Sequence, residues 1–410
     1  MAALAAAGEL VPLVEHRREV LERIGPLEPI DLALLEAHRS VLAEDVDAAD
    51  DVPPFDNSAM DGYAVASDDL AAGTEVPLGG EIAAGDAPAG PLDPGTAVRI
   101  MTGAPIPEGA TTIVPVEEAR ERGDTLVLES DARPGAHIRP AGESVRAGDR
   151  VVGAGRRLGA AEIGMLAAAG RRSVRAHPTP RVVVVSTGDE LVEPGAPLRP
   201  GQIRDSNSYM LTAMAREAGA VAYRHLFVRD DERALVEAFE GALVHADVLV
   251  TSGGVSAGAH DHVKGVLARL GDVEFRKVGM KPGMPQAFGF VDGVPCFALP
   301  GNPVSAFVSF EVFVRPAIRR MQGRSDLNRP QVAARLATAH RSPSDKVEFV
   351  RVRLERDEGG GWQAVPTGEQ GSGILRSAVL ADGLAEIPPD VRDAAPGTLV
   401  TVHRLRDGDG

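Results

Sequence analysis

Residues 181–191 read RVVVVSTGDEL and join a short apolar run to a loop that contains glycine. Four consecutive valines are typical of a buried strand, and a glycine directly after a strand is typical of a tight loop. The same combination recurs at residues 251–256 (TSGGVS) and 299–303 (LPGNP), each after another predicted strand. In an open α/β sheet, ligands bind at the carboxyl ends of the strands. The three loops therefore predict a binding site at one edge of a sheet, although glycine and proline in any one loop could serve the turn alone.

The surrounding region, residues 181–322, alternates between predicted strands and helices with short loops between them. Ser206 or Asn207 is expected to cap a helix that runs to residue 218, and Pro303 suits the first position of a helix that runs to residue 321. This alternation predicts a mainly parallel, doubly wound sheet. The expected strands are 181–186, 221–228, 247–251, 273–278, 286–290 and 294–298, and the other expected helices are 231–245 and 261–270.

Three other patterns flank the α/β region. Apolar residues recur at helical spacing between residues 10 and 46, which predicts two helices, and helical spacing returns at 160–169. Short β-type runs separated by glycine and proline fill 51–143, and a period of two dominates after 328. We therefore predict a helical N-terminal domain from 1–50 with 145–178, an inserted β-rich domain over 51–144, the α/β domain over 179–327 and a C-terminal β-barrel domain over 328–410.

The composition argues against several classes of protein. The chain has 410 residues and a formal net charge of −16, which argues against a general partner of nucleic acid or of a membrane surface. Its single cysteine, Cys296, excludes an internal disulfide and a cysteine-rich metal site. The Ala-rich N-terminus lacks the features of a signal peptide, and the apolar runs are too short to span a bilayer. These features predict a cytoplasmic protein.

The lysines are few and unevenly spread. Only four of the 43 basic residues are lysines, and three of them, Lys264, Lys277 and Lys281, lie within 18 positions. A compact ammonium suits some anion sites better than a planar guanidinium, so the three lysines suggest an anion clamp. Lys281 lies in the rigid run 278–285 (VGMKPGMP), which we expect to carry it toward the same sheet edge. Chance clustering under a bias toward arginine is the alternative.

Acidic residues also follow the predicted strands. Glu190, Asp230, Asp231 and Asp261 lie in or next to the loops of the α/β region. Carboxylates favour a bound phosphate only when a cation lies between them, and Mg²⁺ binds through one or two carboxylates together with phosphate oxygens. Asp231 and Asp261 also begin predicted helices, so capping is an alternative role for these two.

Seven motifs in this order resemble the molybdopterin molybdenumtransferases of the MoeA type, which are related to the E domain of gephyrin. They are PPFDNSAMDGYA (53–64), RIMTGAP (99–105), STGDEL (186–191), SGGVS (252–256), KPG (281–283), LPGNPVS (299–305) and QGSG (370–373).

The resemblance implies a molybdopterin-binding α/β domain and an elongated homodimer whose active site is shared between subunits. The implied substrates are adenylated molybdopterin, supplied by a molybdopterin adenylyltransferase, and molybdate. Molybdenum would be inserted at the dithiolene with the help of Mg²⁺, and AMP and molybdenum cofactor would be released.

The resemblance also implies roles for single residues. The implied catalytic residues are Asp61, Thr102, Glu190, Asp230 and Asp261, of which Glu190 and Asp261 would hold the metal. Together, the resemblance and the glycine-containing loops suggest the residues that bind the pterin and the anion. They are Ser252, Gly253, Gly254, Ser256, Lys277, Lys281, Pro300, Gly301, Asn302 and Pro303.

The sequence departs from the family pattern at two positions that bear on activity. Ser144 stands where an aspartate often follows the pair Gly142–Glu143, and Met284 stands where a basic residue often follows KPG. These departures favour a non-catalytic pterin-binding or scaffolding paralogue. The retention of Asp61, Thr102, Glu190 and Asp261 favours the transferase.

Overall fold

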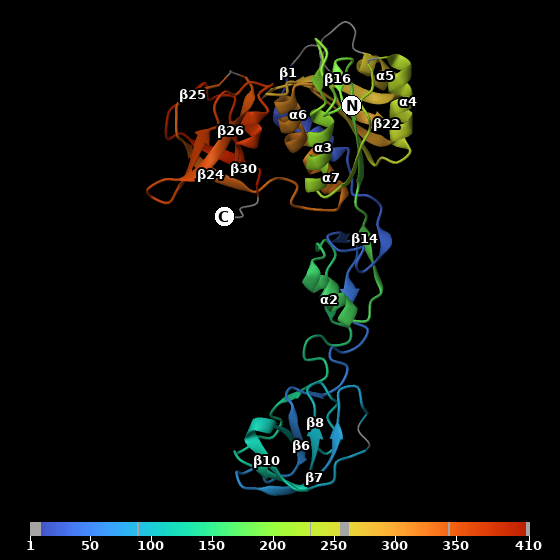
Figure 1. The fold of residues 1–410 in the computed structure, drawn as a ribbon, viewed down its shortest axis with the longest axis vertical. Coiled ribbons are helices and arrows are strands. Elements are labelled where there is room, and N and C mark those ends of the chain that lie inside the picture. The colour runs from blue at the N-terminus through green and yellow to red at the C-terminus, as the bar shows by residue number, and fades with distance from the viewer. Residues whose placement is uncertain (1–9, 88–89, 230, 255–261, 343–344, 407–410) are drawn as a thin grey trace. The chain divides into compact units, whose positions relative to one another are not determined.

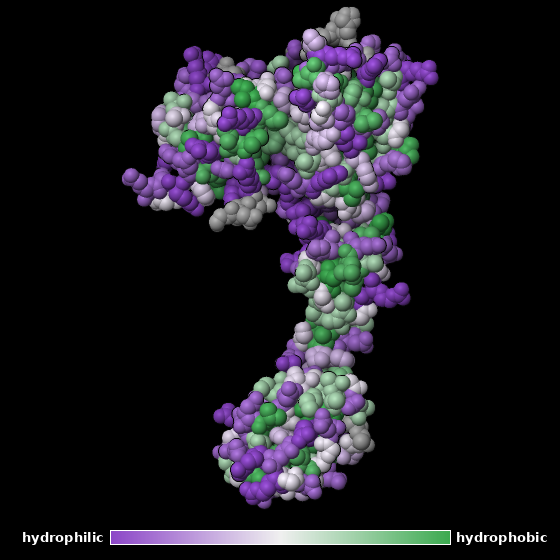
Figure 2. Space-filling model, in the orientation of Figure 1, coloured by the Kyte–Doolittle hydropathy of each residue, from purple (hydrophilic) through white to green (hydrophobic). Residues whose placement is uncertain are grey.

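The computed structural model describes residues 10–87, 90–229, 231–254, 262–342 and 345–406 (Figure 1). The chain forms two compact units, of which the first combines residues 1–30 with 177–410 and the second consists of residues 31–176. The boundaries of the four predicted domains within these units stay predictions. Hydrophilic residues cover much of the visible face of each unit (Figure 2), and no helix in the described ranges is long and apolar enough to cross a membrane.

A seven-stranded sheet forms the centre of the first unit. Every neighbouring pair of strands is parallel except the two pairs that β22 makes. The prediction of a mainly parallel sheet is therefore confirmed. The order is β1 (Leu10–Val11), β20 (Gly271–Val278), β22 (Pro285–Val291), β23 (Val294–Leu299), β19 (Val248–Ser252), β15 (Arg181–Ser186) and β18 (Val221–Arg224).

Helices cover both faces of this sheet, which confirms the doubly wound arrangement. Val182 and Val184 of β15 point into one core and Val183 and Val185 into the other, because side chains alternate along a strand. The first core includes residues of α1 (Leu13–Glu22), α3 (Asn207–Glu217), α6 (Pro303–Ser309) and α7 (Arg315–Met321), and the second includes residues of α4 (Glu232–Leu243) and α5 (His262–Leu270). A π-helical turn, Phe310–Val314, joins α6 to α7, so the helix predicted from Pro303 to Met321 forms without a break.

Five strands at the C-terminal end of the chain close into a barrel, as the sequence predicts. Each has two neighbours in the ring, and β21 (Met280–Lys281) adds to β26 from outside. The ring order is β26 (Val347–Arg356), β27 (Trp362–Pro366), β24 (Gln331–Leu336), β30 (Leu399–Arg404) and β28 (Gly383–Ile387). Smaller elements of this unit are β16 (Leu191–Val192), β17 (Ile203–Arg204), β25 (His340–Arg341), β29 (Asp393–Ala394) and α8 (Arg376–Val379).

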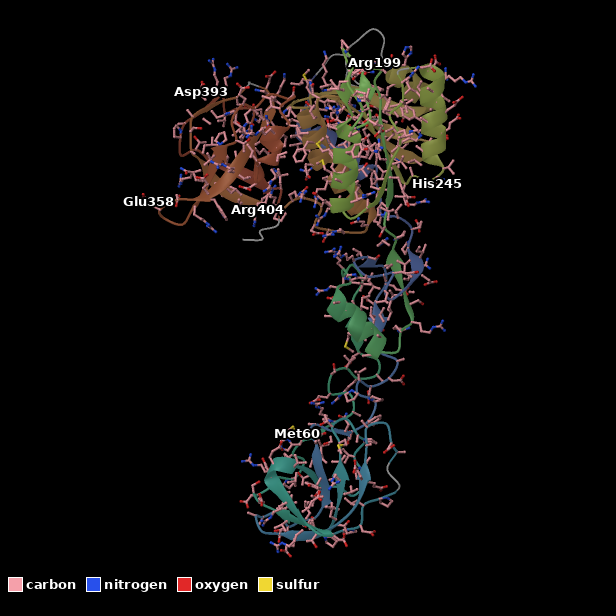
Figure 3. The ribbon with its side chains drawn as sticks, viewed as in Figure 1. Met60, Arg199, His245, Glu358, Asp393 and Arg404 are labelled. Carbon is pink, nitrogen blue, oxygen red and sulfur yellow. The ribbon has the colours of Figure 1, made fainter. Side chains whose placement is uncertain are left out.

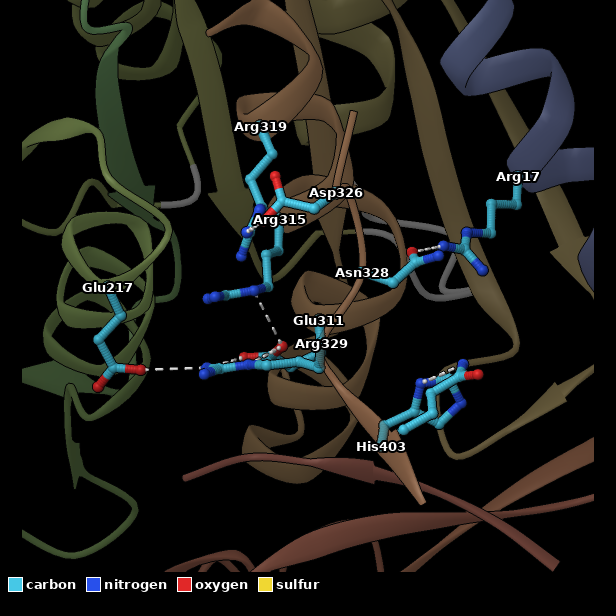
Figure 4. A network of polar contacts seen from close by, with 10 residues as sticks. Arg17, Glu217, Glu311, Arg315, Arg319, Asp326, Asn328, Arg329 and His403 are labelled. Carbon is cyan, nitrogen blue, oxygen red and sulfur yellow. Dashed lines mark hydrogen bonds and ion pairs between the residues drawn. The ribbon is translucent and has the colours of Figure 1, made fainter. Parts of the chain in front are cut away.

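Ion pairs fasten the segment that leads from α7 into the barrel (Figure 4). Asp326 accepts hydrogen bonds from Arg324 at 2.7 Å and from Arg319 at 2.5 Å. These arginines hold the pKa of Asp326 at about 2, mainly through the hydrogen bond from Arg324. Arg329 pairs with the buried Glu311 of the π-helical turn at 2.9 Å. The segment is therefore tied to the α/β domain by charge rather than by apolar contacts alone.

In its described residues, the second unit contains a six-stranded sheet and one α-helix, α2 (Ala160–Ala168). The sheet order is β10 (Ala119–Arg122), β11 (Thr125–Leu128), β7 (Glu75–Ile82), β8 (Thr96–Ile100), β6 (Gly62–Ala66) and β9 (Thr112–Pro115), with a 3-10 turn at Val116–Glu118. The predicted β-rich character of this region is confirmed. Short pairings supply the rest: β5 (Asn57–Ser58) with β12 (Ile138–Arg139), β4 (Val46–Asp47) with β13 (Arg150–Val152), and β14 (Ser173–His177) between β2 (Ile30–Ala33) and β3 (Val41–Leu42).

Only one of the two helices predicted between residues 10 and 46 forms. α1 packs against the large sheet, with Leu13 and Val20 in the first core. The second prediction was wrong, because residues 30–42 form β2, a turn and β3, and Leu35 is 84% exposed. Both strands pair with β14, more than 130 positions further along the chain, so a distant partner overrides the local helical spacing.

Candidate functional site

A cavity of about 610 Å³ lies at the carboxyl ends of β15, β19 and β23. All three glycine-containing loops contribute to its wall, as the sequence predicts for this sheet edge. Its volume is in the range of sites that bind small molecules. The lining residues include Ser186, Thr187, Gly188, Glu190, Ser252, Gly253, Gly254, Pro300, Gly301, Asn302 and Pro303, together with Ile203, Arg204, Asp205, Ser206, Asn207, Pro285 and Gly373.

Backbone hydrogen bonds join the three loops to one another. Thr187 N donates to Ser252 O at 3.0 Å, and Gly253 N donates to Leu299 O at 3.1 Å. Gly253 has a φ of +98°, and a Cβ at this position would lie 2.6 Å from Thr187 O. Only glycine therefore fits at this position, and its bare backbone forms part of the wall of the cavity.

Asn207 holds two of the loops together by its side chain. Its Nδ2 donates to Ser252 Oγ and to Gly301 O, both at 2.8 Å. Ser206 occupies the N-cap position of α3, as predicted, but its side chain makes no capping hydrogen bond. The carboxylate of Asp205 does this instead, since it accepts hydrogen bonds from Ser208 N at 3.0 Å and Ser208 Oγ at 2.5 Å. Because Asp205 satisfies the helix end, the amide of Asn207 can serve the loops.

Residues 203–207 (IRDSN) form a part of the wall that the sequence did not predict. β16 and β17 pair side by side, with Leu191 opposite Ile203, and Ile203 N donates to Glu190 O at 2.8 Å. This pairing places Arg204 at the cavity beside the STGDEL loop. The signal in the sequence is a polar run before a helix, and such runs more often indicate helix caps than a binding site.

The C-terminal barrel contributes the QGSG loop. Gly373 lines the cavity, and Val304 N of α6 donates to Ser372 O at 3.0 Å. Arg351, which is fully buried, supports this loop from within the barrel through its backbone N, which donates to Gln370 Oε1 at 2.8 Å. Burial lowers the pKa of Arg351 to about 10.

Of the acidic residues assigned to catalysis or metal binding in the α/β domain, the structure describes Glu190. Its exposed carboxylate lies at the cavity, whereas both oxygens of Asp205 accept hydrogen bonds from Ser208. Asp230, Asp261 and Ser256 lie outside the described residues. Among the residues that are described, no three His, Cys, Asp or Glu side chains gather to hold a metal. The single carboxylate of Glu190 beside a wall of glycine backbone nevertheless fits Mg²⁺, which can take its other ligands from phosphate and water.

The three lysines of the predicted anion clamp do not gather at the cavity. Lys264 of α5 lies 5.5 Å from the ring centre of Phe275, and the Lys281 ammonium pairs with Glu348 at 2.9 Å. Lys277 is exposed on β20 and stands opposite Pro285, which does line the cavity. Closeness in sequence therefore does not bring the three side chains to one place.

Asp61 and Thr102 form a second cluster, in the other unit. Thr102 donates from its backbone N at 2.7 Å and from its Oγ1 at 2.8 Å, both to Asp61 Oδ1. Asp61 precedes β6 and Thr102 follows β8, two antiparallel neighbours with Gly62 opposite Ile100. The hydrogen bonds from Thr102, above all the one from its backbone, lower the pKa of the exposed Asp61 carboxyl. Met60, which is labelled in Figure 3, marks this end of the sheet.

Comparison with known proteins agrees with this architecture from end to end. Family models match three consecutive parts: the MoeA N-terminal region (domain I and II) at residues 11–170, a probable molybdopterin binding domain at 183–320 and the MoeA C-terminal region (domain IV) at 333–405. The order of the three matches and the share of the chain that they cover define a multidomain protein built around an α/β domain of the molybdopterin-binding type.

Two curated relatives and one solved structure show the same relationship. Molybdopterin molybdenumtransferase 2 of Mycobacterium tuberculosis is 45% identical over 402 residues, covering 95% of this chain and 98% of that one. Molybdopterin molybdenumtransferase of Haemophilus influenzae is 35% identical, covering 96% and 98%. A molybdopterin biosynthesis MoeA protein from Pyrococcus horikosii superimposes with a TM-score of 0.81 at 32% identity, covering 98% and 100%. The chain belongs to the MoeA family of molybdopterin molybdenumtransferases.

Proposed function

We propose that this protein is a transferase of molybdenum cofactor biosynthesis. It inserts molybdenum from molybdate into adenylated molybdopterin and releases AMP and molybdenum cofactor. The observation that carries the proposal is the cavity of about 610 Å³ at the carboxyl edge of the sheet, walled by the three glycine-containing loops. The names of its relatives, which match over nearly their whole length, support the same reaction.

The cavity suits a ligand that carries both a ring system and phosphate. Gly253, Gly254 and Gly301 have no side chains, so a phosphate can approach the backbone closely. Arg204 adds a guanidinium, which matches phosphate oxygens in a planar geometry. A polar wall of this kind binds an anion locally even though the whole chain carries a net charge of −16.

Glu190 is the described carboxylate that would hold Mg²⁺, together with phosphate oxygens of the substrate. When bound, Mg²⁺ would supply positive charge beside the phosphates. Arg204 and the loop amides would neutralise the remaining negative charge as the bond between the two phosphates breaks. Asp261, which lies outside the described residues, remains the second predicted metal ligand.

The site is proposed to be shared between two copies of the chain in a homodimer. The Asp61–Thr102 cluster holds an ionised carboxylate on an exposed surface, where it can face a ligand bound by a second copy. Asp61 would then orient a water molecule at the phosphates of that ligand. Thr102 holds the carboxylate in place from two directions.

A non-catalytic pterin-binding protein is the second candidate. Ser144 in place of a family aspartate and Met284 in place of a basic residue favour it. Such a protein would bind adenylated molybdopterin in the cavity without molybdate-dependent release of AMP.

The deciding experiment incubates the purified protein with adenylated molybdopterin, Mg²⁺ and molybdate and follows AMP. Molybdate-dependent release supports the transferase, and tight binding without release supports the second candidate. Mixing the variants Asp61→Asn and Glu190→Gln then tests the shared site. Random exchange of subunits restores about one quarter of the wild-type activity if each site uses Glu190 of one copy and Asp61 of the other. Mixtures as inactive as the separate variants would contradict a shared site.

A further inference from the structure

The loop that carries Lys281 is joined to the C-terminal barrel through one buried carboxylate. β21 runs parallel to β26 with Lys281 opposite Glu348, and Val347 N donates to Gly279 O at 3.0 Å. The Lys281 ammonium lies 2.9 Å from Glu348 Oε1. The other oxygen, Glu348 Oε2, lies 2.9 Å from His340 Nε2. Each oxygen of this carboxylate therefore has its own partner.

Exposure differs sharply across the pair. The Glu348 side chain is 1% exposed, whereas the Lys281 side chain is 46% exposed. Burial of a carboxylate costs free energy unless its oxygens are paired. The two partners of Glu348 therefore fix the position of its side chain. The ammonium has three N–H donors, and the one directed to Glu348 leaves the exposed side of the group turned to solvent. Lys281 is thus anchored and accessible at the same time.

The backbone of this loop is fixed by contacts that do not involve Glu348. Gln286 Nε2 donates to Gly283 O and to Ser309 Oγ, both at 2.5 Å. Val278 N donates to Met284 O at 2.7 Å, which closes the base of the loop. Removal of the Glu348 charge should therefore free the Lys281 side chain and leave the path of the loop intact.

Among the described residues, the wall of the cavity does not include Lys281, but the loop that carries Lys281 and the barrel that carries Glu348 both reach the cavity. Pro285, where the loop returns to the sheet, and Gly373 of the barrel both line it. We infer that Glu348 is a positioning residue that holds the Lys281 ammonium for the anionic part of the substrate, with His340 fixing the second carboxylate oxygen. This inference rests on the proposed function and extends it to a residue of the C-terminal barrel.

The ligand of Lys281 is an oxyanion, and two substrates carry one: molybdate itself and the phosphates of adenylated molybdopterin. Steady-state kinetics distinguish them, because each substrate can be varied while the other is saturating. Glu348→Gln keeps a hydrogen-bonding side chain of the same length and removes its charge. We expect it to raise KM for one of the two substrates about three- to tenfold, with kcat changed less than about twofold.

Four further variants separate positioning from a general loss of structure. Glu348→Asp keeps the charge, so its KM should lie closer to the wild-type value than the KM of Glu348→Gln. Glu386→Gln is the matched control, because Glu386 pairs with His403 at 2.8 Å in the same barrel, and it should leave KM unchanged. If Glu348 acts through Lys281, the double variant Glu348→Gln/Lys281→Met should be no worse than Lys281→Met alone. Additive losses in the double variant would overturn the inference.

A labelling experiment tests the inference without any activity. The sequence has four lysines, Lys264, Lys277, Lys281 and Lys346, so mass spectrometry can follow the acetylation of each by acetic anhydride. In Glu348→Gln the ratio of Lys281 to Lys277 labelling should rise about threefold, because the ammonium loses a charged hydrogen-bond partner. An unchanged ratio would overturn the inference. If the wild type releases no AMP, the proposed function fails, while the labelling ratio still decides whether Glu348 holds Lys281.

Discussion

The cavity of the first unit and the Asp61–Thr102 cluster of the second hold their functional groups in opposite ways. The cavity is formed by backbone and by partly exposed amide contacts such as those of Asn207, and its charged lining among the described residues is Glu190, Arg204 and Asp205. The cluster is one ionised carboxylate on an exposed surface, held by two hydrogen bonds from Thr102. The first arrangement forms a cavity, and the second leaves a charged group exposed.

This difference separates the expected effects of substitutions. Changes in the cavity should lower affinity and stability together, because the same contacts shape the wall and hold the loops. Changes at Asp61 should lower turnover alone, because an exposed side chain contributes little to folding.

The largest effect is expected for Asp61→Asn. Asparagine can still accept both hydrogen bonds from Thr102 but carries no charge, so turnover should fall about 10²- to 10³-fold. The free energy of unfolding should change by less than about 0.5 kcal/mol. AMP release and urea unfolding measure the two quantities. Thr102→Ser keeps both donors and serves as the near-neutral control, and a matching fall in substrate affinity in Asp61→Asn would remove the contrast.

Gly253→Ala should have the next largest effect. The new Cβ would lie 2.6 Å from Thr187 O at a φ of +98°, so two loops must separate. We expect a loss of about 3 kcal/mol in the free energy of unfolding and at least tenfold weaker binding of adenylated molybdopterin.

Gly265→Ala is the control for this change, because Gly265 lies in α5 and, apart from its chain neighbours and the local helix backbone, no atom lies within 4 Å of the added Cβ. It should stabilise the protein by up to about 1 kcal/mol, since alanine favours a helix more than glycine does. Denaturant unfolding and equilibrium binding check both variants. Normal binding by Gly253→Ala would mean that the wall of the cavity is not built as described.

The two units should also differ in how a single carboxylate makes the free energy of unfolding depend on pH, because Glu348 of the first unit is buried and its counterpart in the second unit is exposed. Burial raises the pKa of Glu348, but hydrogen bonds from His340 and Lys281 outweigh it and set the pKa at about 2. A carboxyl whose pKa is lower in the folded than in the unfolded chain stabilises the fold above the unfolded value, and this contribution disappears as the pH falls through the folded value. Between pH 4.5 and 2 the wild type should thus lose about 2 kcal/mol that Glu348→Gln does not lose.

The counterpart in the second unit is Glu121, whose pKa is lowered by hydrogen bonds from Arg99 and then Tyr63. This carboxylate is exposed to solvent, which screens its ion pair, so Glu121→Gln should leave the acid dependence close to that of the wild type. Unfolding measured at several pH values for the three proteins tests the difference. Equal acid dependence in both variants would contradict the importance of burial.

The sequence predicted elements best where burial is continuous along a short run. Valines 182–185 and the apolar run of β23 are strands in any context that buries both faces, so the sheet and the place of the cavity could be predicted from them. The residues from Leu32 to Leu35 have helical spacing, but β14 supplies a strand partner from far along the chain. A spacing rule contains no information about such a partner.

The site was predictable where one segment carries the signal and not where two distant segments meet. The local composition around Gly253 and around Asn302 is enough to predict where the cavity lies. Arg204 comes to the cavity only through the pairing of β16 with β17, and Lys281 meets Glu348 only through β21 and β26. Three lysines that are close in sequence were expected to share a site, but strands and helices carry them to different places.

The smallest effect is expected at Asn207, and it tests whether the cavity depends on side chains at all. Asn207→Ala removes two hydrogen bonds of 2.8 Å that hold Ser252 and Gly301, and partly exposed bonds of this kind are worth about 1 kcal/mol together. We expect that loss in the free energy of unfolding and about fivefold weaker binding of adenylated molybdopterin. Ser206→Ala is the matched control, because Ser206 lines the same cavity but its side chain makes no capping bond to α3. If the two variants behave alike, the backbone alone shapes the cavity, and its contrast with the side-chain cluster at Asp61 becomes sharper still.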